Sequence, residues 1–318
     1  MMKRYNQDFI HDFGLKLLII EWLLHALQKF AVTISWKNKL YDWEHTIKRT
    51  ILRRQFIPIL SEIIAESADQ IQKASTSRIP KKIWVFWWQG NQKDIPLVHA
   101  CISSIEEYKG DDTTLVVLTK ENLHQYCTIP PMFYEKLENG NITLTHFSDI
   151  VRVSVLAEQG GVWLDATIFA LGDFSYIFSN EFWTIRKQVE THAFIPMGRW
   201  SIYAMAAVPR HPIFMLMKLL FTQYWATHTT MLDYFLVDYC LDFLYEQIPS
   251  VKTCLDDVSL SNPKVLDLQK VMCSEYSDVL ITELLEKTQL FKLSWKEKCP
   301  IQNNHKQTVF GWLLQQRN

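Results

Sequence analysis

The chain has 318 residues, of which 48% are hydrophobic and 13% aromatic, so it can bury a substantial core. Its 33 lysines and arginines nearly balance 34 aspartates and glutamates, and the net charge of -1 excludes a globally basic nucleic-acid-binding protein. The six cysteines form no Cys-x-x-Cys pair and no Cys/His cluster, which argues against zinc and against a dense disulfide scaffold. We therefore expect a globular protein of the reducing cytoplasm, without a secretory signal.

An N-terminal helical extension is predicted over residues 1–78, and the Ser-Thr-Ser-Arg-Ile-Pro run at 75–80 is typical of a junction. Residues 9–30 are its most hydrophobic part, but charged residues interrupt them too often for the roughly 20 mostly apolar residues of a membrane span. Basic side chains and tryptophans follow. One interpretation is an amphipathic arm that lies on an anionic membrane surface. The other is a helical hairpin that packs on the rest of the chain or on a second subunit of a homo-oligomer.

Residues 79–318 are predicted to form one α/β domain. Expected strands at 82–88 and 115–118 flank a helix that begins at Pro96, which makes a βαβ unit. The other expected elements are short helices at 122–127 and 131–137, a short strand at 142–144, a helix from an N-cap at Ser148 to Gln159, extended pieces at 182–185 and 204–208, and helices at about 212–247 and 276–290.

A carboxylate stands at the end of the strand that follows the expected Ser148 helix. Gly160 or Gly161 can end that helix in the left-handed conformation, after which 162–164 is an apolar, buried strand and Asp165 follows it. In open α/β sheets, ligands bind at the carboxyl ends of the strands. The position predicts that Asp165 faces a ligand, and the alternative is an acid that caps a turn through Thr167.

Asp149 and Arg152 lie three residues apart on the preceding helix and share a face among apolar neighbours. A buried charge must be paired or must hold a ligand, because an isolated desolvated charge costs several kcal/mol. The spacing is therefore compatible with a ligand-binding pair and with a purely structural ion pair.

The combined block SDIVRVSVLAEQGGVWLDAT, residues 148–167, resembles glycosyltransferases that carry a DxD motif in the form D-x-x-R…GG-x-x-x-D-x-D. It is most similar to bacterial capsular polysaccharide synthesis transferases, which are related to glycosyltransferase family 32 and the glucosylating-toxin group. IPKKIWVFWWQG, VVLTKENL and MLDYFLVDY extend the resemblance over roughly residues 79–240, and a weaker match lies at Asn303-Asn-His-Lys306.

The resemblance implies a GT-A fold, which is a Rossmann-like mixed sheet flanked by helices, with a UDP-sugar donor and a divalent metal, Mn2+ or Mg2+. Such a metal neutralises the negative charge that develops on the departing diphosphate. Asp165 matches the first acid of the motif as a metal ligand, whereas Thr167 stands where many relatives carry the second, so we expect weaker metal binding. The resemblance also implies that His305 completes the metal shell and that Lys306 contacts the phosphates.

Donor contacts follow from the same resemblance: Asp149 and Arg152 to the sugar and its phosphates, Trp87 and Trp88 to the base, and Thr119 to the base or ribose. Alternation along the strand puts Trp84 and Trp88 on one face and Trp87 on the other. At least one of these tryptophans must therefore belong to the core.

The resemblance therefore implies a metal-dependent retaining hexosyltransferase with Asp165, Asp149 and Arg152 as its catalytic residues. We expect transfer from a UDP-sugar to an undecaprenyl-linked saccharide in capsule or O-antigen synthesis, at the inner face of the bacterial plasma membrane, with no nucleic-acid partner. The alternative is a catalytically inactive relative that only binds a glycan or a nucleotide, because Thr167 replaces the second acid.

Overall fold

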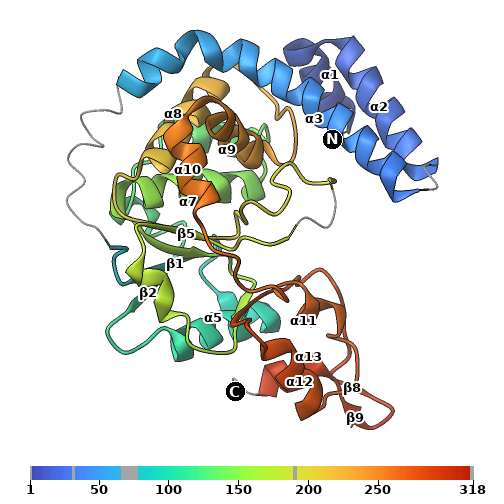
Figure 1. Ribbon diagram of the computed structural model, residues 1–318, viewed down its shortest axis with the longest axis vertical. Helices are drawn as coiled ribbons and strands as arrows, with labels where there is room; N and C mark the ends of the chain where they lie inside the picture. Colours follow the sequence, from blue (N-terminus) through green and yellow to red (C-terminus); the bar gives the residue numbers. More distant parts are fainter. Residues whose placement is uncertain (1, 31–32, 66–77, 189–191, 316–318) are drawn as a thin grey trace.

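The computed structural model describes residues 2–30, 33–65, 78–188 and 192–315 (Figure 1). A central sheet is built from β1 (Lys82–Phe86), β2 (Thr114–Leu118), β3 (Gly161–Leu164), β5 (Phe182–Thr184) and β6 (Ala204–Ala207). The strand order is β2-β1-β3-β6-β5. β1 is parallel to β2 and β3, whereas β6 is antiparallel to β3 and β5, so β6 runs against the other four strands. The predicted mixed, Rossmann-like α/β sheet is confirmed.

Four helices flank this sheet: α5 (Pro96–Tyr108), α7 (Leu144–Gln159), α8 (Pro212–Thr227) and α9 (Leu236–Gln247). Side chains alternate along β1, so Trp84 and Phe86 pack with α7, α8 and α9 on one face. Ile83 and Val85 pack with α5 on the other face. Figure 1 shows α5 on the opposite side of the sheet from α7, α8 and α9. Trp84 is therefore the core tryptophan that alternation required, and it is fully buried.

The N-terminal extension consists of α1 (Met2–Phe13), α2 (Leu15–Phe30) and α3 (Ile34–Phe56), and α3 packs on α9. Arg49 of α3 donates two hydrogen bonds to Asp242 of α9, at 2.7 and 2.9 Å. The Asp12 carboxylate accepts hydrogen bonds from the backbone of Thr229 and Thr230. The extension thus packs on the rest of the chain, as one of the two interpretations expected. Residues 75–77 of the predicted junction at 75–80 lie outside the described residues, which resume at residue 78.

The C-terminal region adds a second small sheet, in which β4 (Ile168–Ala170) pairs with β7 (Leu290–Lys292) in antiparallel register. Cys273 and Cys299 form a disulfide in this region, which the cysteine spacing did not predict.

The other α-helices and strands are α6 (Pro131–Glu138), α10 (Pro249–Asp256), α11 (Asp267–Lys270), α12 (Asp278–Leu285), α13 (Val309–Gln315) and the hairpin of β8 (Gln302–Asn303) and β9 (Lys306–Gln307).

Two local predictions are wrong around the start of α7. The expected strand at 142–144 does not form, because Thr143 caps the helix: its side-chain oxygen accepts a hydrogen bond from the His146 backbone. Ser148, the expected N-cap, therefore lies inside the helix. The helical region expected at about 212–247 forms as two helices, α8, which ends at Thr227, and α9, which begins at Leu236.

Within the described residues, no helix combines the length and the apolar composition that a membrane crossing requires.

Candidate active site

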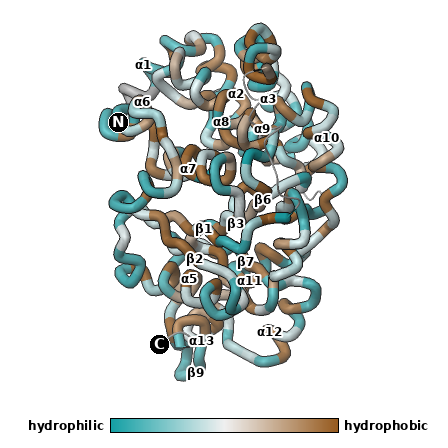
Figure 2. Tube along the Cα trace, turned by 90° about the vertical axis from the view of Figure 1, so that its left-hand side faces the viewer, coloured by the Kyte–Doolittle hydropathy of each residue, from teal (hydrophilic) through white to brown (hydrophobic). Residues whose placement is uncertain are grey.

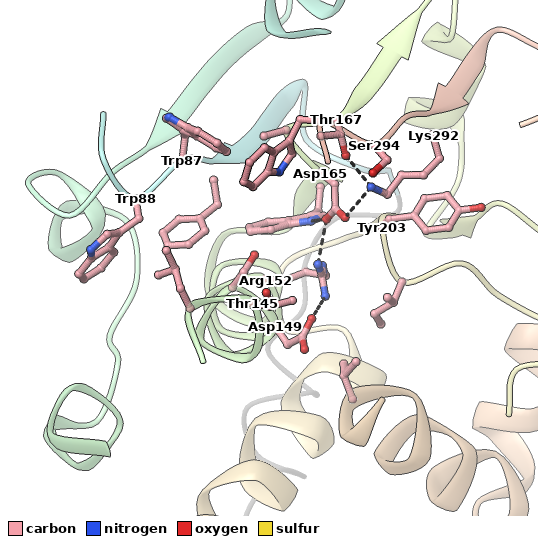
Figure 3. A pocket seen from close by; sticks show the side chains of 18 of the residues that line it. Trp87, Trp88, Thr145, Asp149, Arg152, Asp165, Thr167, Tyr203, Lys292 and Ser294 are labelled. Atoms are coloured by element: carbon pink, nitrogen blue, oxygen red, sulfur yellow. Dashed lines mark hydrogen bonds and ion pairs between the residues drawn. The ribbon is translucent and has the colours of Figure 1, made fainter. Parts of the chain in front are cut away.

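The parallel strands β1, β2 and β3 end at the same edge of the sheet, and a cavity of about 480 Å³ opens there (Figure 3). Trp87, Trp88 and Asp165 follow two of these strands and line the cavity, as expected for a ligand site in an open α/β sheet. Further walls come from α7, from the start of α9, and from residues 292–296, which comprise the last residue of β7 and the segment that follows it.

Two glycines position Asp165. Gly160 ends α7 with a φ of 62°, and a Cβ added there would lie 2.5 Å from the Pro209 backbone nitrogen. At Gly161, with a φ of 96°, a Cβ would lie 2.7 Å from both the Lys82 carbonyl oxygen and Trp84 Nε1. A side chain at either position would be strained and crowded. The glycines therefore let β3 start close against β1 and bring Asp165 to the cavity.

Arg152 bridges the two aspartates that the sequence singled out. Its Nη1 donates to Asp149 Oδ1 at 2.5 Å and its Nη2 to Asp165 Oδ1 at 2.9 Å. The guanidinium also lies 4.9 Å from the ring centroid of Trp163, whose Nε1 donates to Asp165 Oδ1. Burial opposes its charge, but Asp165 and Asp149 raise the pKa of Arg152 above its ordinary value. Arg152 is thus a fixed cation between α7 and β3, and both aspartates still line the cavity.

Lys292 is a cavity residue that the sequence did not reveal. The pairing of β4 with β7 sets Lys292 opposite Ile168, directly after Thr167. Lys292 Nζ donates to Thr167 Oγ1 at 2.5 Å and lies 3.7 Å from Asp165 Oδ2. Figure 3 shows the ammonium between the two side chains. The sequence analysis expected no strand at 290–292, and nothing in the sequence pairs Lys292 with Thr167.

The donor set around Asp165 does not fit a divalent metal. Asp165 Oδ1 already accepts two hydrogen bonds, Oδ2 faces Lys292, and the hydroxyl oxygen of Thr167 accepts from the same ammonium. Divalent cations of the predicted kind need several oxygen ligands and no competing cation. Among the described residues, no group of three or more His, Cys, Asp or Glu side chains could hold a metal ion.

A model of capsular polysaccharide synthesis proteins matches residues 30–312. The chain belongs to this family. The likeness predicted from the motif is confirmed, and the match also includes α3 of the N-terminal extension. No curated protein matches the chain. Among solved structures, the chain is similar to the PaToxG glycosyltransferase, with 17% identity, a TM-score of 0.37, and coverage of 66% of this chain and 84% of that one. This structural likeness is too distant to carry an argument.

In this member of the capsular polysaccharide synthesis family, the aromatic end of the cavity is formed by Trp87 and Trp88. Trp88 packs edge to face with Phe147 at 5.3 Å, and Lys120 Nζ lies 5.9 Å from the Trp88 ring centroid. The indole nitrogen of Trp87 is buried and has no hydrogen-bond partner among the described residues. A buried donor without a partner is costly, so a bound ligand that accepts this hydrogen bond would stabilise the site.

Three predicted site residues lie elsewhere. Thr119 follows β2 but does not line the cavity, and its backbone nitrogen donates to Asn122 Oδ1 at 2.8 Å. His305 is exposed at the turn between β8 and β9 with a φ of 64°. Lys306 is also exposed and forms an ion pair with Glu275 at 2.7 Å. The structure therefore does not bring His305 or Lys306 to Asp165, because the hairpin that carries them projects from the C-terminal region.

Asp238 adds a further carboxyl to the cavity wall. It is 4% exposed and accepts a hydrogen bond from Trp200 Nε1 at 2.8 Å. Burial raises the pKa of Asp238 to about 7, although the bond from Trp200 opposes the shift. With this pKa the side chain is about half protonated at neutral pH, and its protonated form can donate a hydrogen bond.

Proposed function

We propose that the protein is a retaining glycosyltransferase that moves a hexose from a UDP-sugar to a lipid-linked saccharide in capsule or O-antigen synthesis. One observation carries the proposal: Asp165, at the carboxyl edge of the sheet, is held by Arg152 in a cavity that combines indole rings, cations and carboxyls. Membership of a capsular polysaccharide synthesis family supports it.

The cavity suits each part of such a donor. Trp87 and Trp88 offer aromatic surface for a base. Arg152, Lys292 and the neighbouring Lys296 line the cavity and offer positive charge to a diphosphate. Carboxylates accept hydrogen bonds from sugar hydroxyls, which is the role we assign to Asp149 and Asp165.

The described cavity residues include no carboxylate whose placement identifies it as a covalent nucleophile, so we favour a front-face displacement. The bond between the sugar carbon and the β-phosphate oxygen breaks, and the acceptor oxygen forms its bond to that carbon on the same face. The acceptor proton passes to the departing phosphate oxygen. The cations that face the diphosphate lower the barrier because negative charge grows there as the bond breaks.

A donor screen tests the proposal. Purified protein is incubated with UDP-Gal, UDP-Glc, UDP-GlcNAc or UDP-GalNAc, in EDTA and in Mn2+, and release of UDP is measured. We expect one donor to be hydrolysed slowly, and Asp165→Asn to lower the rate about 100-fold or more with an unchanged circular dichroism spectrum. Asp111→Asn, at an exposed aspartate away from the cavity, is the matched control. Binding of UDP without turnover of any donor would support the inactive binding relative instead.

The N-terminal extension supports a membrane-bound acceptor. Along α2 and the start of α3, large apolar side chains are exposed: Leu15, Ile19, Trp22, Leu23, Leu27, Phe30, Ile34 and Trp36. Figure 2 shows the hydrophobic stretches of α2 on this part of the molecule. Lys16, Lys29, Lys37 and Lys39 lie in the same segment. We infer that this face lies on an anionic membrane surface.

Co-sedimentation with vesicles of phosphatidylglycerol and phosphatidylcholine tests this surface. We expect Trp22→Ser/Phe30→Ser to lose most of the vesicle-bound fraction, and the control Val279→Ser, at an equally exposed apolar residue, to keep it. If instead the wild type ignores vesicles and light scattering shows a dimer that Trp22→Ser/Phe30→Ser abolishes, the face is a subunit interface.

A further inference from the structure

The predicted metal position is occupied by a cation of the protein itself. We propose that Lys292 is the fixed cation that neutralises the donor diphosphate, and that donor binding needs no divalent metal. The inference rests on the proposed function, because it assumes a nucleoside diphosphate donor.

The geometry puts the ammonium between the two side chains that a DxD-type metal would use. Lys292 Nζ is 2.5 Å from Thr167 Oγ1 and 3.7 Å from Asp165 Oδ2. A divalent ion bound by these oxygens would have to displace the ammonium or lie against it, and like charges at such a separation repel strongly. Thr167, which stands in the second acidic position of the motif, thus accepts a hydrogen bond from Lys292.

The charge of Lys292 is only partly compensated. Its short hydrogen bond goes to a neutral hydroxyl, a second contact at 3.3 Å goes to the Leu293 carbonyl, and Asp165 is at 3.7 Å. Asp165 in turn shares its charge with Arg152. The side chain of Lys292 remains 25% exposed in the cavity. An anion that enters the cavity can therefore pair with an ammonium already held in place, which costs little ordering of that side chain.

Titration calorimetry with UDP, in EDTA and in Mn2+, tests the inference. We expect wild-type affinity to agree within about twofold between the two buffers. In EDTA, Lys292→Met should weaken UDP binding about tenfold or more, the size expected for the loss of a charged hydrogen bond. Binding of uridine, which has no phosphate, should not change. Lys306→Met removes an exposed lysine outside the cavity and should leave UDP binding unchanged.

A charge exchange sharpens the test. The double variant Thr167→Asp/Lys292→Ala supplies the second acid of the motif and removes the ammonium. We expect it to bind UDP weakly in EDTA and about tenfold more tightly in Mn2+, because two carboxylates without a competing cation suit the metal. A double variant that binds UDP in EDTA as tightly as the wild type would overturn the inference.

The outcomes also separate this inference from the proposed function. A wild-type UDP affinity that rises tenfold or more with Mn2+, or a Lys292→Met variant that binds UDP normally, overturns the role of Lys292 and leaves the transferase intact. UDP binding that does not depend on metal, without turnover of any donor sugar, supports the role of Lys292 and overturns the transferase. Absence of UDP binding in both buffers overturns both.

Discussion

Two lysines of this protein, Lys48 and Lys292, lie near carboxylates, and they differ in how fully their charge is compensated. Lys48 of α3 is 3% exposed and contacts three carboxylates: Glu44 at 2.7 Å, Glu21 at 3.3 Å, and Asp233. Lys292 has one carboxylate at 3.7 Å and one hydroxyl. The negative charge around Lys48 exceeds the charge of the lysine. The positive charge of Lys292 is only partly compensated, so it can pair with a further anion.

The surroundings explain what each cluster does. Burial opposes the charge on Lys48, but Asp233, Glu44 and Glu21 together raise its pKa above the ordinary value. Burial also opposes the charge on Glu21, and it raises the pKa of this carboxyl although Lys48 lowers it. The Lys48 cluster therefore joins α2, α3 and the loop before α9, and we assign it to structure. The Lys292 cluster opens into the cavity, and we assign it to binding.

Loss of Lys48 should give the largest effect. Lys48→Met leaves the buried Glu44 and the partly buried Glu21 and Asp233 without their cation, so the free energy of unfolding should fall by about 3 kcal/mol. Lys292→Met should lower it by less than about 1 kcal/mol, because this side chain is partly exposed and its hydrogen bond goes to a hydroxyl. Urea denaturation monitored by circular dichroism compares the two variants. Equal losses would contradict the division into a structural and a binding cluster.

Asp238 extends the comparison to a carboxyl of the cavity. Burial raises the pKa of this carboxyl, whereas a neighbouring cation compensates the charge of Asp165. In the folded protein it keeps its proton up to about pH 7, whereas the unfolded chain releases it near the ordinary value of 3.8. Stability contributed by this group therefore falls as pH rises through that window. Relative to wild type, Asp238→Asn should gain about 2 kcal/mol between pH 5 and pH 8.

Thermal or urea unfolding at pH 5 and pH 8 measures this difference, and Asp111→Asn serves as the exposed control. The hydrogen bond from Trp200 can be kept by the amide oxygen of the variant. Parallel pH profiles for wild type and Asp238→Asn would show that the carboxyl is ionised at both pH values.

Thr167→Val should give the smallest effect. The substitution removes the hydroxyl that orients Lys292 but keeps both the ammonium and Asp165, so UDP affinity in EDTA should fall only about threefold. Calorimetry compares this variant directly with Lys292→Met. A loss as large as that of Lys292→Met would mean that the hydroxyl itself, and not the charge of the lysine, holds the diphosphate.

The part of the site that could be predicted is local in the chain. Asp149, Arg152 and Asp165 lie on one helix, a two-glycine turn and the next strand, so periodicity and turn chemistry place them together. The cap at Thr143 was missed because Thr143 and Ser148 are both acceptable capping residues and only packing selects between them. His305 and Lys306 were placed by resemblance, and the hairpin that carries them turns away from the cavity.

By itself, the sequence determined the α/β sheet, the buried strand before Asp165, and membership of the capsular polysaccharide synthesis family, because these depend on short-range patterns and a nearly contiguous motif. The tertiary structure alone decided which cation faces Asp165. Lys292 is 125 residues from Thr167 and meets it through the pairing of β4 with β7. No local propensity encodes that contact, since strand pairing brings together residues whose separation along the chain carries no information about their distance in space.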